Sequence, residues 1–401
     1  MRQHACKGPG RDDIRDIIRL HEVYMVYIVT RQQVQAIQYS FEDLLFNRIP
    51  VNAFATPEGS SGTITRKVES VNDEIRSQVN ITGLINVLKD FNEKHNALFQ
   101  VPRESLYTTF YIPKKSGGLR KIDKPNQELM AALRTLKEIL EKYCGILHHT
   151  AAFAYVKDRS IVDAIMKHQA NNSNWFLKTD FSNFFPSTTL EFTMKMFSMI
   201  FPFNEIVKIP EGKKQLTITL SLAFLNGGLP QGTPLSPTLT NIIMIPIDHA
   251  LFNDFAKRKY VYTRYADDMI ISCEQYFDYR KIVSYIKGIL KQFGTPFAIN
   301  DEKTRYGSKK GSNWNLGLML NKDNNITVGY MRKKQFKAAM NNFILDTLHN
   351  KPWPVNDIQT LQGTVSYYKM VEVNYFNDII NKMNTKYQVD FEQMMKNQLM
   401  L

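Results

Sequence analysis

The sequence has little cysteine and no long hydrophobic run near its start. Its 401 residues contain three cysteines and no C-x-x-C pair, which argues against a disulfide framework and against a structural zinc site. The longest apolar run near the N-terminus is Val23 to Val29, far short of the roughly 20 residues that span a bilayer. The first residues also lack the pattern of a signal peptide. We therefore expect a soluble, cytoplasmic protein without a membrane partner.

Acidic residues are also in deficit. There are 38 Asp and Glu against 51 Lys and Arg, a formal net charge of +13. Such a charge favours a polyanionic partner, usually nucleic acid, with an anionic membrane surface as the weaker alternative. Residues 301–340 carry nine Lys or Arg and three Asp or Glu, interleaved with Tyr306, Trp314 and Tyr330. This segment is either a track for a nucleic-acid backbone or a solvated charged face.

The apolar pattern predicts an α+β centre between two mainly helical flanks. We expect a mainly helical extension over residues 1–100, with a flexible Gly/Ser/Thr-rich loop near 55–72. Strands are predicted from short apolar runs, and helices from apolar residues at helical spacing. The predicted strands span 175–181, 260–264 and 269–273, with a hairpin over 106–122. The predicted helices span 82–99, 129–147, 190–201 and 238–257, and about 70 C-terminal residues are expected to be helical with a break at 351–354.

Three acidic residues, in two separate segments, carry the strongest chemical signal. Asp267 and Asp268 lie between two predicted strands, and Asp180 lies near the end of another. An acidic surface turn is the plainer explanation of an Asp-Asp pair, but carboxylates at the ends of buried strands are costly without a cation. Mg²⁺ binds through a few carboxylates together with substrate phosphates, and two such ions can clamp a phosphoryl transfer. The constellation therefore predicts nucleotidyl transfer.

Five ordered motifs give the chain a clear resemblance to the palm of reverse transcriptases. They are Asp180 with FSNFFPS (motif A), LPQGTPLSP at 229–237 (motif B), YADD at 265–268 (motif C), NDEK at 300–303 (motif D) and NLGL at 315–318 (motif E, the primer grip). The resemblance implies a right-hand polymerase whose palm is an antiparallel sheet packed on helices. Fingers and palm would span 101–320, and a helical thumb would span 321–401.

The resemblance also implies the catalytic and metal-binding residues. Asp180, Asp267 and Asp268, with the carbonyl of Phe181, would hold two Mg²⁺ ions, for which Mn²⁺ could substitute. Lys303 would be the general acid for the departing pyrophosphate, although a plain surface lysine is nearly as good an interpretation.

The nucleotide-binding and primer-binding residues follow from the same resemblance. Phe185 would be the steric gate against a ribose 2′-hydroxyl, unless it is a core residue. Leu316 and Gly317 would form the primer grip. The residues implied in dNTP binding are Lys114, Lys115, Arg120, Phe185, Gln231 and Gly232.

Further segments resemble bacterial retron-type enzymes. They are AYVKDRS at 154–160 and the thumb-like LQG at 361–363 with SYYKMVE. Of the retron N-A-x-x-H signature only His168 is shared, and Thr327-Val328-Gly329 stands in place of V-T-G. The resemblance implies a retron-like, defence-associated reverse transcriptase that copies a structured non-coding RNA into DNA during anti-phage defence. His168 alone is more typical of a structural histidine than of a catalyst.

Three other readings stay open. One is retron synthesis of branched, RNA-linked DNA, and another is template-independent DNA synthesis primed on a protein side chain. The third, least favoured because the three carboxylates and Gln231 are intact, is an inactive RNA-binding protein. The oligomeric state is also left open.

Overall fold

The computed structural model describes residues 80–399 except 115–116, 145–146, 311–313 and 315–316. The predicted N-terminal extension up to residue 79, with its loop at 55–72, therefore lies outside the described residues, as do Lys115 and Leu316. The described part of the chain divides into two compact units. The first contains residues 80–96, 142–144 and 197–219, and the second contains residues 97–141, 147–196 and 220–399.

Helix α4 (Ile81–Lys94) and most of α11 (Pro210–Ser221) form the first unit, joined by a buried polar contact. Asn92 donates from Nδ2 to Oε1 of Gln215 at 2.8 Å, and the hydroxyl of Thr219 donates to Oδ1 of Asn92 at 2.8 Å. Each buried amide and hydroxyl in this contact thus has a partner, as burial requires. Short helix α10 (Phe203–Ile206) completes the unit.

Two predicted helices differ from the expected spans: one is interrupted, and the other ends early. The helix predicted over 82–99 breaks at His95 into α4 and α5 (Asn96–Gln100). The helix predicted over 190–201 ends as α9 (Leu190–Phe197), five residues before Pro202. The residue before a proline is biased away from helical geometry, so the predicted end at residue 201 was unfavourable.

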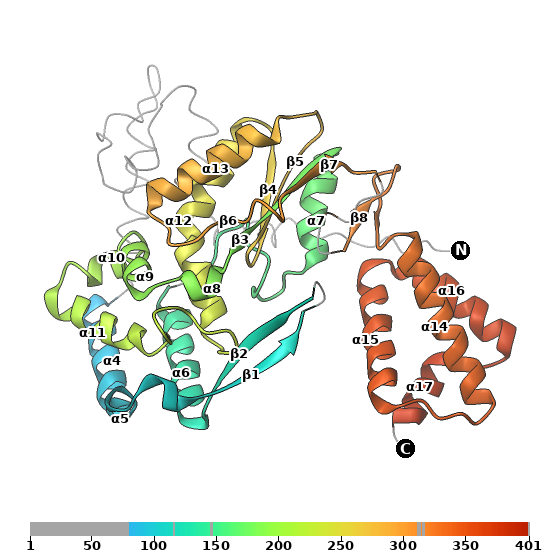
Figure 1. Cartoon of the computed structure of the whole chain (residues 1–401), viewed down its shortest axis with the longest axis horizontal. Helices are drawn as coiled ribbons and strands as arrows, with labels where there is room; N and C mark the ends of the chain where they lie inside the picture. The colour runs from blue at the N-terminus through green and yellow to red at the C-terminus, as the bar shows by residue number, and fades with distance from the viewer. Residues whose placement is uncertain (1–79, 115–116, 145–146, 311–313, 315–316, 400–401) are drawn as a thin grey trace, which may run out of the picture. The chain divides into compact units, whose positions relative to one another are not determined.

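The second unit contains a five-stranded antiparallel sheet with β3 at its centre (Figure 1). The order is β4-β5-β3-β6, and β7 also pairs with β3. The strands are β3 (Trp175–Ser182), β4 (Val261–Tyr265), β5 (Asp268–Cys273), β6 (Ala298–Ile299) and β7 (Arg305–Ser308). All three predicted strands are confirmed to within two residues, and the mixed α+β class is confirmed with them.

Helices cover both faces of this sheet because its residues alternate. The helices are α7 (Ile161–Ala170) and α12 (Ser236–Lys257), and α13 (Tyr279–Phe293) packs on α12. On one face, His168 of α7 bonds to Thr263 and Ser272. On the other face, Asp248 of α12 bonds to Arg264, the residue after Thr263 along β4.

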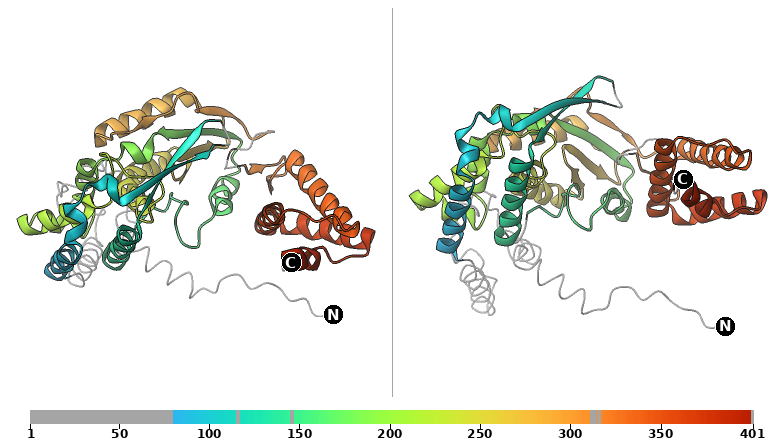
Figure 2. Two further views of the ribbon diagram at one scale, coloured as in Figure 1. Left: turned by 60° about the horizontal axis from the view of Figure 1, so that its bottom comes forward. Right: turned by 90° about the horizontal axis from the view of Figure 1, so that it is seen from below.

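The predicted hairpin is confirmed as β1 (Tyr107–Pro113) paired with β2 (Leu119–Pro125), side by side in both views of Figure 2. Gly117 and Gly118 both have positive φ, which a tight turn requires. A short 3-10 helix (Arg103–Leu106) precedes the hairpin, α6 (Gln127–Cys144) follows it, and α8 (Phe184–Ser187) follows β3.

The C-terminal segment is helical, as predicted. A two-stranded pair, β8 (Met319–Leu320) and β9 (Ile326–Thr327), precedes it. Four helices follow: α14 (Tyr330–Leu348), α15 (Val355–Val371), α16 (Val373–Tyr387) and α17 (Phe391–Leu399). Their core includes the rings of Phe336 and Tyr368, stacked with centroids 4.2 Å apart. Across the described residues, none of the helices is long and apolar enough to cross a membrane.

Candidate active site

Strand pairing brings the distant acidic residues to one end of the central sheet. The β3–β5 register places Asp180 directly opposite Asp268. A two-residue turn, Ala266-Asp267, joins β4 to β5. The turn is tied back to β3 because the backbone N–H of Phe181 donates to the carbonyl of Asp267 at 3.2 Å.

Asp180 is a buried carboxylate with one oxygen paired and one not. Its Oδ2 accepts a hydrogen bond from Nζ of Lys303 at 2.6 Å. Its Oδ1 is buried and has no hydrogen-bond partner. The bond to Asp180 raises the pKa of Lys303, so this ammonium stays charged. A buried, unpartnered carboxylate oxygen is costly, and a cation is the ligand that would satisfy it.

Asp267 and Asp268 have different surroundings. Burial raises the pKa of Asp267, and the charges of Asp268 and Asp180 raise it further. Asp268 instead forms an ion pair with Lys178, whose Nζ lies 3.1 Å from Oδ1. Three acids lie at this end of the sheet, so their mutual repulsion favours a positive ion between them.

The acids fit Mg²⁺ as partial ligands rather than as a closed cage. Among the residues that the structure describes, no cluster of three or more His, Cys, Asp or Glu is arranged to hold a metal ion. Mg²⁺ is commonly held by one or two carboxylates, with water and substrate phosphates completing its shell. The orphaned Oδ1 of Asp180 and the crowded carboxylate of Asp267 meet that requirement.

A family comparison identifies the fold that carries these acids. The profile of the family described as Reverse transcriptase (RNA-dependent DNA polymerase) matches residues 112–337, more than half of the chain. The chain belongs to the reverse transcriptase family. The matched range contains all the strands of the central sheet and all three aspartates.

Curated relatives of this reverse transcriptase include several retron enzymes. It is 29% identical over 286 residues to the retron Ec83 reverse transcriptase of Escherichia coli, an alignment that covers 69% of this chain and 86% of the relative. It is 23% identical over 319 residues to the retron Ec86 reverse transcriptase of Escherichia coli, covering 75% and 94%. A solved apo telomerase of Candida tropicalis, truncated from its C-terminal domain, aligns with a TM-score of 0.41 and 14% identity, covering 77% of this chain and 76% of that one.

Two adjacent phenylalanines of the reverse transcriptase have different environments. Phe184 is buried, its ring packed 5.2 Å from that of Phe181 and 4.9 Å from that of Phe297. Phe185 is half-buried, and its carbonyl accepts a hydrogen bond from the N–H of Leu229 at 3.0 Å. Phe184 is therefore the core residue, and Phe185 lies beside the segment that leads into Gln231.

The Gln231-Gly232 segment contacts the β1–β2 hairpin. The N–H of Asp123 donates to the carbonyl of Gln231 at 2.7 Å. Gly232 has a φ of +120°, and a Cβ there would lie 2.9 Å from the carbonyl oxygen of Asp123. The hydroxyl of Ser236 donates to the carbonyl of Pro230 at 2.9 Å and holds the segment from the other side. A side chain at Gly232 would thus force the hairpin and the segment apart.

The described basic residues predicted in the hairpin lie at or next to its turn. Arg120 is exposed on β2, opposite Ile112, and Lys114 is exposed in the turn, where its N–H donates to the carbonyl of Gly118 at 3.0 Å. Both side chains are accessible to an anion, but no contact in the structure assigns either of them to a triphosphate.

Three residues near the acids were missed by sequence reasoning. They are Lys178, Tyr155 and Arg264. Burial raises the pKa of Tyr155, and so does the charge of Asp267, whereas Arg120 lowers it. Tyr155 also has a positive φ of 59°, rare for a residue with a bulky side chain. The clue in the sequence was its position in the AYVKDRS segment, but nothing there indicated proximity to an aspartate 112 residues later.

The three aromatic residues of the basic segment 301–340 do not share one environment, so they do not form the continuous exposed track that one of the two sequence interpretations requires. Trp314 is wrong as a nucleic-acid contact: it is buried, stacked on Phe176, and donates from Nε1 to the carbonyl of Ser308 at 3.1 Å. Tyr306 lies within an aromatic cluster, and Tyr330 alone of the three is well exposed, at 76%. Gly317 has a φ of +99° and its carbonyl accepts from Nη1 of Arg332 at 3.1 Å.

His168 is a structural histidine, as the sequence favoured. It is fully buried, and burial lowers its pKa to about 3, so the ring is neutral. The hydroxyl of Ser272 donates to Ser173, so Ser272 accepts from Nδ1–H of the ring at 2.6 Å. Nε2 then accepts from the hydroxyl of Thr263 at 2.8 Å. The two hydrogen bonds of the ring therefore link α7 to β4 and β5.

Proposed function

We propose that this reverse transcriptase uses Mg²⁺ and dNTPs to copy a dedicated, structured non-coding RNA into DNA, and that it does so in the bacterial cytoplasm during anti-phage defence. The observation that carries the catalytic part is the strand pairing that puts Asp180 opposite Asp268 and ties the Asp267 turn to Phe181, with Oδ1 of Asp180 unpartnered. The resemblance to retron-like enzymes supports the RNA and defence parts, and the net charge of +13 is consistent with a bound RNA.

The acids and the groups predicted to act with them have proposed tasks. Asp180 and Asp267, with the Phe181 carbonyl, would hold the metal ions. Asp268 would lie close to the ions while paired with Lys178. When bound, such ions lower the charge on the reacting phosphate and stabilise the attacking and leaving oxygens. Lys303 would pass its proton to the departing pyrophosphate, a move for which its long, exposed stem leaves room.

The nucleotide would be selected on the neighbouring surface. Phe185 would exclude the ribose 2′-hydroxyl, and Gln231 with Gly232 would lie under the new base pair. Arg120 with Lys114 or Lys115 would neutralise the triphosphate, as cationic clamps do in phosphoryl transfer. Leu316 and Gly317 would hold the primer end. We propose fingers and palm over 101–320 and the thumb over 321–401.

Incorporation of dNTPs by the purified protein tests the catalytic part. The protein is assayed with and without its co-purifying RNA, beside an Asp267→Ala/Asp268→Ala variant, and the RNA is sequenced. We expect incorporation that requires both the RNA and the two aspartates. Incorporation that survives the double substitution would refute the metal site, and equal incorporation without RNA would refute templated synthesis.

The similarity to enzymes named as retron reverse transcriptases favours a second candidate. In that case the DNA product is covalently joined to RNA. Treating the product with ribonuclease and with protease separates the alternatives. A ribonuclease-dependent shift in mobility indicates RNA-linked DNA, whereas a protease-dependent shift indicates DNA primed on a protein side chain.

A further inference from the structure

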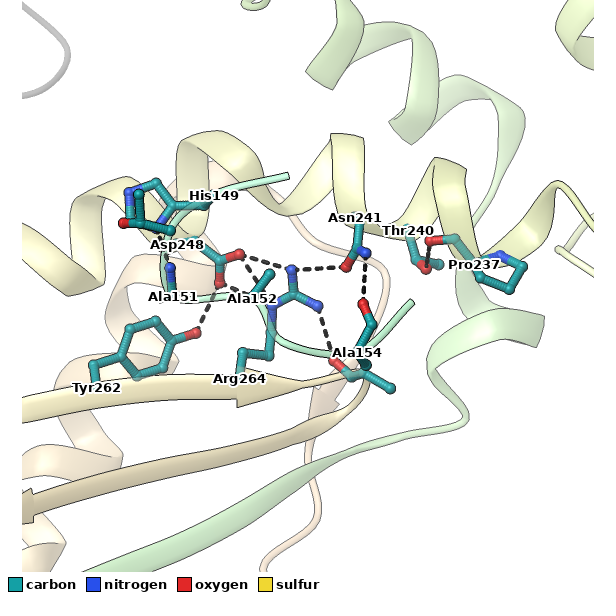
Figure 3. Close-up of polar contacts among 12 residues, drawn as sticks. His149, Ala151, Ala152, Ala154, Pro237, Thr240, Asn241, Asp248, Tyr262 and Arg264 are labelled. Atoms are coloured by element: carbon teal, nitrogen blue, oxygen red, sulfur yellow. Dashed lines mark hydrogen bonds and ion pairs between the residues drawn. The ribbon is translucent and has the colours of Figure 1, made fainter. Parts of the chain in front are cut away.

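Arg264, immediately before the YADD turn, is completely buried together with its partner Asp248 of α12 (Figure 3). Its Nε lies 2.9 Å from Oδ1 of Asp248, and Nη2 lies 2.7 Å from Oδ2. Buried ion pairs are expensive to desolvate, and apolar replacements of the same volume are often equally stable. Stability alone is therefore a weak reason for this pair.

The remaining arm of the guanidinium reaches the turn itself. Nη1 of Arg264 donates to the carbonyl of Ala266 at 3.0 Å. Ala266 has a φ of +57°, a left-handed conformation that is unfavourable for a residue with a Cβ. Such a conformation persists only where the surroundings hold it. Arg264 on Ala266 and Phe181 on Asp267 together hold two successive carbonyls of the turn.

The guanidinium is itself fixed in place. The hydroxyl of Tyr262 donates to Oδ1 of Asp248 at 2.8 Å. Asn241 accepts from Nη2 of Arg264 at 3.2 Å and donates to the carbonyl of Ala154 at 2.9 Å. Figure 3 shows these groups surrounding the planar fork from α12, β4 and the 149–154 segment. A flexible ammonium could not make all of these contacts at once.

We propose that Arg264 is a positioning residue for catalysis: anchored on Asp248, it holds the Ala266 carbonyl and so fixes the turn that presents Asp267 to the metal ions. The inference rests on the proposed metal-binding role of Asp267. It extends that role by assigning the geometry of the turn to a residue that touches neither metal nor nucleotide.

Two variants separate positioning from stability. Arg264→Lys keeps the charge beside Asp248 but loses the donor to Ala266. Asp248→Leu/Arg264→Met removes the buried pair and the desolvation cost of its two charges, and it leaves the Tyr262 hydroxyl and the Asn241 amide oxygen without these partners. For each variant we would measure the melting temperature, kcat, the KM for dNTP, and Mn²⁺ binding to the protein alone by electron paramagnetic resonance.

For both variants we expect kcat to fall by about 100-fold and Mn²⁺ to bind about tenfold more weakly, because small misplacements at a reacting centre have effects of this size. The KM for dNTP should change far less than kcat. The control Asn92→Ala breaks a different buried contact, between α4 and α11, so it should lower the melting temperature without changing kcat or Mn²⁺ binding.

Wild-type kcat and Mn²⁺ affinity in a folded double variant would overturn the proposal. If the double variant does not fold, Arg264→Lys decides: a lower melting temperature with unchanged kcat and Mn²⁺ affinity would overturn it equally. Asp267→Ala runs in parallel. If that variant keeps full activity and Mn²⁺ binding, the metal site itself is wrong, which is a different outcome from a failure of Arg264 alone.

Discussion

Lys303, the proposed general acid, contacts Asp180, a proposed metal ligand, directly: Nζ of the lysine donates a hydrogen bond to Oδ2 of the aspartate at 2.6 Å. The side chain of the lysine is 65% exposed, whereas that of the aspartate is 7% exposed. The ammonium therefore neutralises the buried carboxylate from the solvent side. With metal ions on Asp180, the same long side chain would be released toward the nucleotide's phosphates.

Lys303→Ala should lower kcat by about 100-fold, because general acid catalysis contributes roughly 10²- to 10⁴-fold. The variant should also be less stable, because it leaves the buried carboxylate of Asp180 without a partner on either oxygen. Steady-state incorporation of dNTP and thermal unfolding measure the two effects. Lys287→Ala is the matched control, because Lys287 is also exposed and ion-paired, with Asp301 at 2.8 Å. Equal, small losses of kcat in both variants would show that Lys303 is only a surface lysine.

Phe185→Ala should admit ribonucleotides, reducing the preference for dNTP over NTP by about tenfold, because a pocket that gains the volume of a ring no longer rejects one hydroxyl. The measurement is kcat/KM for each nucleotide with the same template. Phe184→Ala serves as the comparison: it should lower the melting temperature, since its ring packs between Phe181 and Phe297, and leave the preference unchanged. An unaltered preference in the Phe185 variant would contradict the gate.

Sequence reasoning placed the central strands and the hairpin because their signals are local. An apolar run of seven residues and a turn built on Gly117 and Gly118 need no tertiary context. The sequence also allowed the prediction that Asp180 lies near the YADD turn, because carboxylates at the ends of buried strands are costly without a shared cation. Which of Phe184 and Phe185 packs in the core was open, because neighbouring identical residues differ only in the direction that the backbone gives them.

Contacts between α12, β3 and the YADD turn could not be predicted. Arg264 meets Asp248 only because one face of β4 turns toward α12, and Lys178 meets Asp268 only through the β3–β5 register. Basic residues around Trp314 suggested a nucleic-acid surface, yet the large ring packs inward because an apolar partner, Phe176, is available. Charge patterns report composition along the chain, whereas burial depends on the fold.

Gly232→Ala should destabilise the protein by about 1–3 kcal/mol, because the site requires a positive φ and the new methyl group would press on the Asp123 carbonyl. Denaturant unfolding and the KM for dNTP are the measurements, and KM should rise as the Gln231 segment shifts. Gly288→Ala is the control: it lies on an exposed face of α13 with open space around it, and it should stabilise the helix slightly. Similar stability changes in the two variants would contradict the close approach.

The protein should lose stability as the pH falls below about 6.5, because buried histidines must stay neutral in the folded chain. The pKa of His168 is lowered to about 3 by burial, and burial also lowers that of His149, with His249 and Arg264 adding to the effect. Between pH 6.5 and the folded-state value, the unfolded chain binds a proton that the folded chain excludes. Stability is therefore full above pH 6.5 and declines below it, by about 1.4 kcal/mol per pH unit for each such histidine.

His168→Asn isolates the contribution of this ring. An amide can still donate to Ser272 or accept from Thr263, but it does not titrate, so the variant should lose about 1.4 kcal/mol less per pH unit than the wild type below pH 6.5. Urea unfolding over a pH series gives the two slopes, and their difference is informative even if the variant is less stable at every pH. Parallel slopes would mean that His168 is protonated in the folded protein. The assignment of a neutral His168 ring between α7 and the sheet would then be wrong.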